Sequence, residues 1–420
     1  MGTDRTDLRV TTLPSGRRVV TDRVPGAASV NVLALVGVGG RDEPAPQAGV
    51  SHFLEHLLCK GSEARSSTEV AEEVDARGGD LDAFTDRERT AVQLRTPAHD
   101  LDFAVDLVGD LVLHPAIRRD EVEVERRVIL EELAQALDDP EDRAHTLTNA
   151  ALYGDHPLAR EIIGDRTTLR ALDTDHIDAF HRAEYHPGAM VVAVAGAVDH
   201  DRVVAMVARW DDGGPADHPA SALAPRVTPT PQPRATEVVR QGGEQVSLVM
   251  SWPLGPVDQP TRLPLAVLAH ILGGGPASRL FRTVRDERGL AYAVDASLAL
   301  YSDVGHLTAF AACSPEAVVP VRATIAAEVE RLATSGPTER EVEVAVGYVA
   351  GSSTLALEDA GTRSWWAAIG ELERGGARPA TEWIDAYRRV TVDQVREVAR
   401  RVSGDPTVVA VGPVPRRAKL

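Results

Sequence analysis

The pentapeptide His52-Phe53-Leu54-Glu55-His56 contains the residues of this 420-residue chain best suited to chemistry. In a helix, side chains four positions apart lie on one face, so His52 and His56 can direct their imidazoles at a single metal ion. From its place next to His56, the carboxylate of Glu55 can reach an attacking water molecule and act as a general base. The alternative is an ordinary amphipathic helix with satisfied histidines. The pentapeptide alone leaves both interpretations open.

A segment dense in proline divides the chain into two nearly equal halves. Between residues 211 and 237, six prolines interrupt any helical or strand periodicity, which is typical of a stiff, extended connection. We therefore predict an N-terminal domain at 1–210, a linker at 211–237 and a C-terminal domain at 238–420.

The two halves repeat each other. Glu121-Val122-Glu123-Val124 returns 220 positions later as Glu341-Val342-Glu343-Val344, and His56-Leu57-Leu58 returns 214 positions later as His270-Ile271-Leu272. The apolar run at 191–194 similarly matches 408–411. Because these landmarks keep the same order, they predict an internal duplication. Coincidence in a chain rich in alanine and valine is the alternative.

A catalytic zinc ion needs a third protein ligand, and the predicted helix 119–137 is rich in carboxylates. In the second half Glu125 and Glu132 become Ala345 and Ser352, and His52 and Glu55 become Ala266 and Ala269. The second copy has thus lost the candidate residues together, as expected for a metal site present in one half only. Glu125 and Glu132 are two helical turns apart and share one face.

The elements that must position these residues are mixed. Helices are predicted at 52–60, 67–77, 101–113 and 119–137, and strands at 8–12, 18–24, 30–38, 90–96 and 191–197. Strands grouped among helices, with hairpins, favour the α+β class. We expect two homologous tandem α/β-sandwich domains, each with a largely antiparallel sheet.

The histidine motif also carries a family resemblance. H-x-x-E-H is the inverzincin motif, and the string Gly49–Gly61 resembles the M16 metallopeptidases, closest to their shorter-subunit branch, which includes the mitochondrial and bacterial processing peptidases. The segments 78–85 and 273–292 resemble two further family signatures. The resemblance covers essentially the whole chain, with Asp82 standing where the family usually has Asn.

What the resemblance implies can be carried onto this chain. His52, His56 and Glu132 match the ligands of a Zn²⁺ ion, and Glu55 matches the base that activates water. Glu125 matches a supporting glutamate near the site. Arg285 and Tyr292 match a pair that binds the substrate backbone and assists the tetrahedral intermediate. Family members of this length are dimers that enclose a chamber, with the Arg/Tyr pair donated by the partner chain.

The composition limits the remaining possibilities. With 45 basic and 63 acidic side chains, the net charge of −18 disfavours binding to nucleic acid or to an anionic membrane. Two cysteines, no stretch of eighteen apolar residues and no apolar run near Met1 favour a cytoplasmic protein without a membrane span.

We therefore expect a zinc-dependent metalloendopeptidase that cleaves peptides or unfolded segments as a homodimer. Extended substrate is expected to add as a strand at a sheet edge near 90–96. The alternatives are a non-catalytic or half-active subunit that needs a homologous partner in a heterodimer, and a metal-dependent enzyme acting on small molecules. The natural substrate and the cleavage preference are left open.

Overall fold

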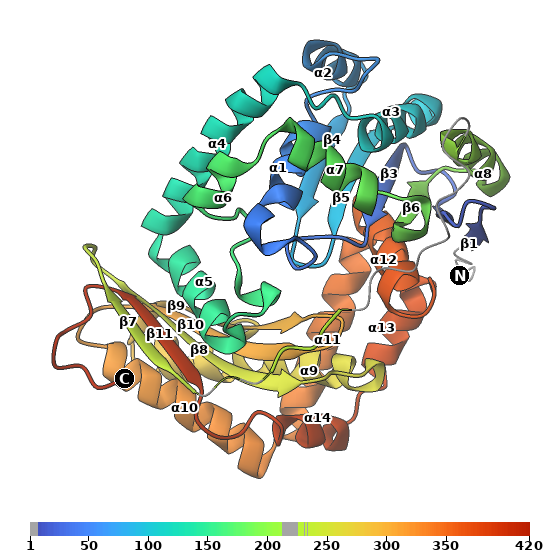
Figure 1. Ribbon diagram of the computed structural model, residues 1–420. Coiled ribbons are helices and arrows are strands. Elements are labelled where there is room, and N and C mark those ends of the chain that lie inside the picture. Colours follow the sequence, from blue (N-terminus) through green and yellow to red (C-terminus); the bar gives the residue numbers. More distant parts are fainter. Residues whose placement is uncertain (1–6, 212–225, 231, 233) are drawn as a thin grey trace. The chain divides into compact units, whose positions relative to one another are not determined.

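The computed structural model describes residues 7–211, 226–230, 232 and 234–420 (Figure 1). Its internal contacts divide the chain into two compact units, and each unit contains a segment from the other half of the sequence. Unit 1 comprises Met1–Leu133, Glu161–Arg226 and Leu355–Trp383, and unit 2 comprises Ala134–Arg160, Val227–Thr354 and Ile384–Leu420. Most of the predicted linker 211–237 lies outside the described residues, and the domain limits 1–210 and 238–420 stay predictions.

Unit 1 is built on a six-stranded sheet with the order β1-β2-β6-β3-β5-β4. Its strands are β1 (Asp7–Thr12), β2 (Arg18–Arg23), β3 (Ser29–Val36), β4 (Asp80–Thr85), β5 (Thr90–Pro97) and β6 (Met190–Gly196). Neighbouring strands are antiparallel except β2 and β6, which are parallel. The central strands β3 and β6 are buried along nearly their whole length, as continuous apolar runs require.

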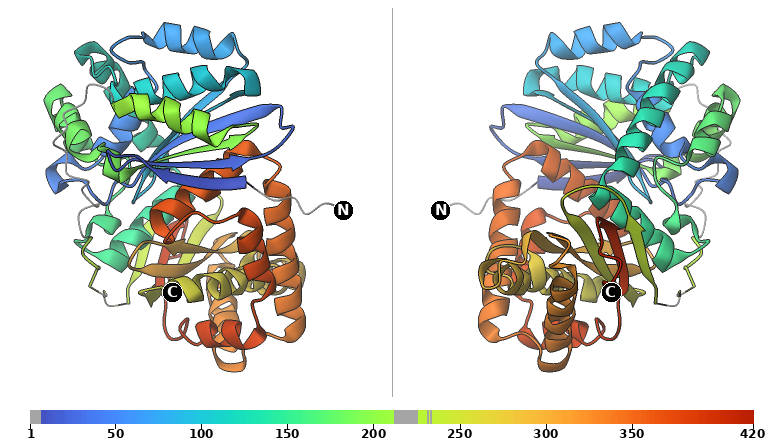
Figure 2. Two further views of the ribbon diagram at one scale, coloured as in Figure 1. Left: turned by 90° about the vertical axis from the view of Figure 1, so that its right-hand side faces the viewer. Right: turned by 90° about the vertical axis from the view of Figure 1, so that its left-hand side faces the viewer.

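Helices cover both faces of this sheet. On one face, α1 (Val50–Leu58) and α3 (Leu101–Leu113) pack their apolar sides into a core with the strands. On the other face lies α12 (Ala360–Glu373), a helix from the second half of the sequence, the orange-red helix below the blue strands in Figure 2. The other helices of four residues or more that lie wholly in unit 1 are α2 (Ser67–Asp75), α6 (Arg166–Ala171), α7 (Thr174–Glu184) and α8 (His200–Ala208).

Unit 2 has the same plan around a five-stranded sheet with the order β7-β11-β8-β10-β9. The strands are β7 (Thr236–Arg240), β8 (Val246–Gly255), β9 (Ala291–Leu300), β10 (Gly305–Cys313) and β11 (Thr407–Gly412), and only the pair β7 and β11 is parallel among them. Its helices include α9 (Gln259–Gly273), α10 (Val318–Ser335), α11 (Glu339–Ala356) and α14 (Val392–Ala399). The helix α5 (Pro140–Tyr153) packs Ala144 against Val249 and Val409 of this sheet. Among the described residues, three helices cross the limits between units: α4 (Arg119–Asp138), α11 at its last two residues, and α13 (Ala380–Arg388).

The repeated element order confirms the predicted α+β class with two largely antiparallel sheets. The helix pair α4 and α5 starts at residues 119 and 140, and the pair α11 and α12 starts at 339 and 360, so the shift of 220 seen in the sequence is kept in the structure. The structure adds that α5 and α12 are each assigned to the unit of the opposite half. Among the described residues, no helix combines the length and apolarity that a membrane span would need.

The sheet edge expected near 90–96 is formed by the strand next to that segment. The predicted strand at 90–96 is not at an edge, because β5 pairs with β3 on one side and with β4 on the other. The edge strand is β4, whose Asp82 lies opposite Gln93 in the register. A strand-adding ligand of unit 1 would therefore meet β4 and not β5 at this end of the sheet.

Candidate metal site

The histidine pentapeptide lies on α1, as predicted. Phe53, Leu54, Leu57 and Leu58 are fully buried and hold the helix against the core of unit 1. The polar residues between them are half-buried, so α1 presents His52, Glu55 and His56 at the border of the core. The alternation follows from the helical period, which separates the apolar from the polar positions.

The helix α4 supplies the carboxylates. Its buried positions Val122, Glu125, Ile129 and Leu133 recur at three- and four-residue intervals and face the core, and Glu132 is half-buried next to them. This spacing brings Glu125 and Glu132 to the side of α4 that faces α1, whereas Glu131 is exposed.

The structure brings His52, His56 and Glu132 together. Oε2 of Glu132 lies 3.9 Å from Nε2 of His52 and 3.4 Å from Nε2 of His56. One ligand atom of each residue falls within 4.8 Å of those of the other two. Ligand atoms around a tetrahedral zinc ion with bonds of about 2.0–2.1 Å lie ~3.3 Å apart, so these three side chains fit such an ion with small movements.

Glu125 contacts one of the candidate ligands. Its buried carboxylate accepts a hydrogen bond from Nδ1 of His56 at 3.1 Å, and Lys60 contacts its other oxygen at 2.9 Å. A proton held at Nδ1 leaves Nε2 of His56 with a free lone pair directed toward Glu132. Glu125 thus orients a candidate ligand instead of serving as one.

Replacing Glu125 by glutamine is expected to weaken zinc binding about 10- to 100-fold, the usual cost of losing a partner that orients a metal ligand. The amide cannot hold the proton of His56 in the same tautomer as firmly, and Lys60 loses its counter-charge. Competition with a chromophoric chelator measures the affinity. The exposed Glu131→Gln is the matched control on the same helix and should bind zinc as the unchanged chain does.

The ionisable side chains on α1 are tuned by burial. Burial, with the neighbouring His56 as the second cause, lowers the pKa of His52 to about 4, so its ring is neutral and able to bind a metal at neutral pH. Burial likewise raises the pKa of Glu55, helped by Asp82 and Glu132 and opposed by a hydrogen bond from Thr85 and by His56. A dication beside Glu55 would also oppose that rise.

Cys59, three residues beyond His56, does not belong to the ligand cluster. Burial raises the pKa of its thiol to about 12, with Glu55 and Asp82 adding to the effect. Cys59 follows the last residue of α1, outside the converging group formed by His52, His56 and Glu132.

Thr85 is a site residue whose role the sequence did not reveal. It ends the edge strand β4 and is one of the groups that lower the pKa of the Glu55 carboxyl against the effect of burial. Its neighbour Asp82 accepts a hydrogen bond from Nε2 of Gln93 at 3.2 Å. Both residues lie in the segment 78–85, so the family-like signature there was the available signal.

Arg285 and Tyr292 lie together in unit 2. The guanidinium carbon of Arg285 is 4.9 Å from the ring centroid of Tyr292 and 4.7 Å from that of Phe281. Tyr292 is the second residue of the edge strand β9 and is 74% exposed, so its side chain is accessible to a ligand. The guanidinium of Arg285 makes cation–π contacts with both rings.

Comparisons with known proteins agree with this fold and motif. The profile described as "Insulinase (Peptidase family M16)" matches residues 18–166, and the one described as "Peptidase M16 inactive domain" matches residues 171–347. The chain belongs to peptidase family M16.

Relatives and solved structures extend over nearly the whole chain. A Mycobacterium tuberculosis protein named as an uncharacterized zinc protease is 42% identical over 94% of this chain and 90% of its own length. A Streptomyces coelicolor protein with the same kind of name is 38% identical over 97% of this chain and 90% of its own length. The crystal structure of a peptidase M16 inactive domain from Pseudomonas fluorescens has a TM-score of 0.87 at 20% identity, covering 99% of this chain and all of that one.

Proposed function

We propose that the chain is a zinc-dependent metalloendopeptidase that hydrolyses peptides or unfolded polypeptide segments. The observation that carries this proposal is the convergence of the ligand atoms of His52, His56 and Glu132 within 4.8 Å. Glu55 lies on the same helix as the two histidines. The names of the mycobacterial and Streptomyces relatives, which call them zinc proteases, support it. Digestion of an unbiased peptide library, with and without chelator, tests it and would define the cleavage preference.

In this proposal, Nε2 of His52, Nε2 of His56 and a carboxylate oxygen of Glu132 hold the zinc ion. When bound, zinc polarises the scissile carbonyl group and makes water more acidic. Glu55 accepts the proton of the attacking water at its carboxylate and later delivers it to the leaving amine nitrogen. Thr85 at the end of β4 lowers the pKa of that carboxyl, which favours the ionised form that a base needs, and Glu125 keeps the proton of His56 at Nδ1.

We also propose that the substrate backbone pairs with β4. This strand ends the sheet of unit 1, so one side of its backbone can take a further strand, and its last residue Thr85 contacts the proposed base. Pairing through backbone groups would tolerate many side chains. A structure with a bound peptide that showed no pairing at β4 would reject this binding mode.

For Arg285 and Tyr292 we propose a contact with the substrate backbone and the developing oxyanion, made across a homodimer. Donors aimed at that oxygen contribute a few kcal/mol of transition-state stabilisation, ~2.7–4 kcal/mol for one donor. The exposure of Tyr292 and its stacking with Arg285 are consistent with a pair presented to another molecule.

Mixing two inactive variants is expected to restore activity if the pair acts between chains. A dimer of a Glu55→Gln chain and an Arg285→Ala chain contains one site with an intact base, served by the arginine of the other chain. Native mass spectrometry monitors the exchange of subunits until mixed dimers have formed. Peptide cleavage by the mixture then measures the restored activity. An Arg282→Ala chain, altered at an exposed arginine nearby, is the control that should be active alone. A mixed dimer without activity would show that the pair serves its own chain or none.

The non-catalytic alternative requires that a ligand or the base be lost. This chain keeps His52, His56, Glu132 and Glu55, and the structure groups the three candidate ligands. Activity of the purified lone chain would separate a homodimer from a half-active subunit that needs a homologous partner.

A further inference from the structure

The first turn of α1 is capped by a residue outside the helix. The carboxylate of Glu43 accepts the backbone N–H of Gly49 at Oε2 and that of Ser51 at Oε1, both at 2.8 Å. Gly49, the residue before the helix, has no side chain to serve as a cap, and the first N–H groups of any helix lack partners within it. Glu43 is only 5% exposed, so this pair of hydrogen bonds is shielded from water.

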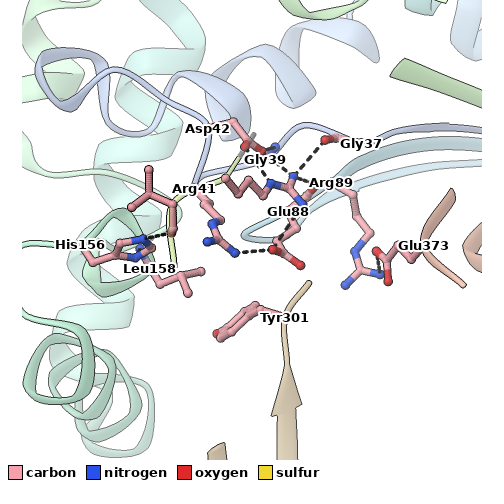
Figure 3. A network of polar contacts seen from close by, with 12 residues as sticks. Gly37, Gly39, Arg41, Asp42, Glu88, Arg89, His156, Leu158, Tyr301 and Glu373 are labelled. Atoms are coloured by element: carbon pink, nitrogen blue, oxygen red, sulfur yellow. Dashed lines mark hydrogen bonds and ion pairs between the residues drawn. The ribbon is translucent and has the colours of Figure 1, made fainter. Parts of the chain in front are cut away.

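The residues before Glu43 hold its loop in place. Arg41 pairs with Glu88 at 2.6 Å (Figure 3). Asp42 accepts two hydrogen bonds from Arg226 at 2.8 and 3.0 Å. Arg226 also donates to the carbonyl oxygens of Gly37 and Glu88. Three consecutive side chains, 41 to 43, therefore tie the loop to the turn between β4 and β5, to Arg226 and to the metal-binding helix.

The second copy of the fold shows that a helix at this place does not need such a carboxylate. At the shift of 214 that relates His56 to His270, Glu43 corresponds to Val257 and Ser51 to Leu265. The helix α9 starts earlier, at Gln259, so Leu265 lies well inside it and its N–H bonds within the helix. In the copy that lacks the metal ligands, the equivalent N–H group thus finds its partner within the helix, because that helix begins earlier.

In the first copy, the helix does not extend toward its N-terminus, because Gly49 has a φ of 95°, outside the right-handed helical region. Glycine is required there, since a Cβ atom would lie 2.4 Å from the carbonyl oxygen of Ile163. The helix therefore begins at Val50, which places His52 in its first turn. Helix N-termini carry roughly half a positive charge, and this disfavours a cation bound in the first turn. The carboxylate of Glu43 offsets that charge.

We infer that Glu43 is a positioning residue of the metal site, which fixes the first turn of α1 and supplies the negative charge that lets His52 hold a dication there. The inference rests on the proposed function, since it assumes that zinc is the ion bound. Glu43 does not contact the ion. It acts through the N–H groups of Gly49 and Ser51 and through the helix that carries the ligands.

The test is the zinc affinity of Glu43→Gln and Glu43→Asp, measured by chelator competition on the full chain. Glutamine keeps the shape but loses the charge and presents an amide to one N–H group, so the affinity should fall about 10- to 100-fold. Aspartate keeps the charge on a shorter side chain and should restore part of the loss. Amide hydrogen exchange at Gly49 and Ser51 should become faster in the glutamine variant.

The control is Glu72→Gln, an exposed glutamate on α2, which should bind zinc like the unchanged chain. If Glu43 had a merely structural role, the glutamine variant would unfold at a lower temperature but bind zinc with unaltered affinity when folded. That result would overturn this inference and leave the proposed function intact. If the glutamine variant did not fold, the aspartate variant would decide by the same measurement. An unchanged chain that bound no zinc would overturn the proposed function as well.

Discussion

Replacing Glu55 by glutamine is expected to lower kcat for peptide hydrolysis by about 10²- to 10⁴-fold, the range that a positioned general base contributes. Glutamine has the same size, but it cannot take a proton from the attacking water. Because Glu55 is not one of the three converging candidate ligands, the zinc content per chain should stay the same. Steady-state cleavage of a fluorogenic peptide and elemental analysis of the purified protein measure the two quantities.

The separation between activity and metal content is what makes this variant informative. Loss of zinc together with activity would mean that Glu55 is needed to hold the ion, and retained activity would mean that another group is the base. Glu72→Gln, altered on the exposed face of α2, should match the unchanged chain in both measurements. A variant at Thr85 that removes its hydroxyl should reduce kcat less than Glu55→Gln, because Thr85 only favours the ionised form of that carboxyl.

The local part of the site could be predicted from the sequence because it depends on helical periodicity. His52 and His56 are one turn apart on one helix, and Glu125 and Glu132 are two turns apart on another, so each pair was expected to share a face. The convergence of the two helices is a long-range property. It could be expected only from the simultaneous loss of these residues in the second copy and from the family resemblance.

The contacts of Glu43 and Thr85 could not be predicted from helical or strand periodicity. Glu43 acts on backbone N–H groups six and eight positions further along the chain, across a loop, and loops have no repeating pattern that assigns such a partner. Thr85 contacts Glu55 because β4 lies next to α1, and the sequence did not indicate which strand would be that neighbour.

The order of the strands and the placement of the helices on the sheets could likewise not be predicted from the sequence. The alternation at 90–96 predicts a strand but not its neighbours, and β5 is paired on both sides, with Gln93 and Arg95 in contact with Asp82 and Asp80 of β4. The helices α5 and α12 each pack against a sheet, and an amphipathic pattern does not say which of two similar sheets a helix will cover.

Replacing Glu132 by alanine is expected to abolish zinc binding at micromolar concentrations, and with it both peptidase activity and stabilisation by zinc. Two imidazoles alone do not complete a catalytic zinc site, which needs three protein ligands. A ligand present at 100 to 1,000 times its dissociation constant stabilises the folded chain by about 2.7–4.1 kcal/mol. The unfolding temperature of the unchanged chain should therefore rise when zinc is added, whereas that of the Glu132→Ala chain should not.

The neighbouring Glu131 provides the matched control for this experiment. It lies one position away on the same helix but is exposed, so Glu131→Ala removes the same charge from α4 without touching the imidazoles. Its zinc-dependent rise in unfolding temperature should equal that of the unchanged chain. If both variants kept the rise, Glu132 would not be a ligand, and the distances of 3.4 and 3.9 Å to His56 and His52 would reflect electrostatic contacts without a metal ion. If only Glu132→Ala lost it, the third ligand of the metal site would be assigned by thermodynamics as well as by geometry.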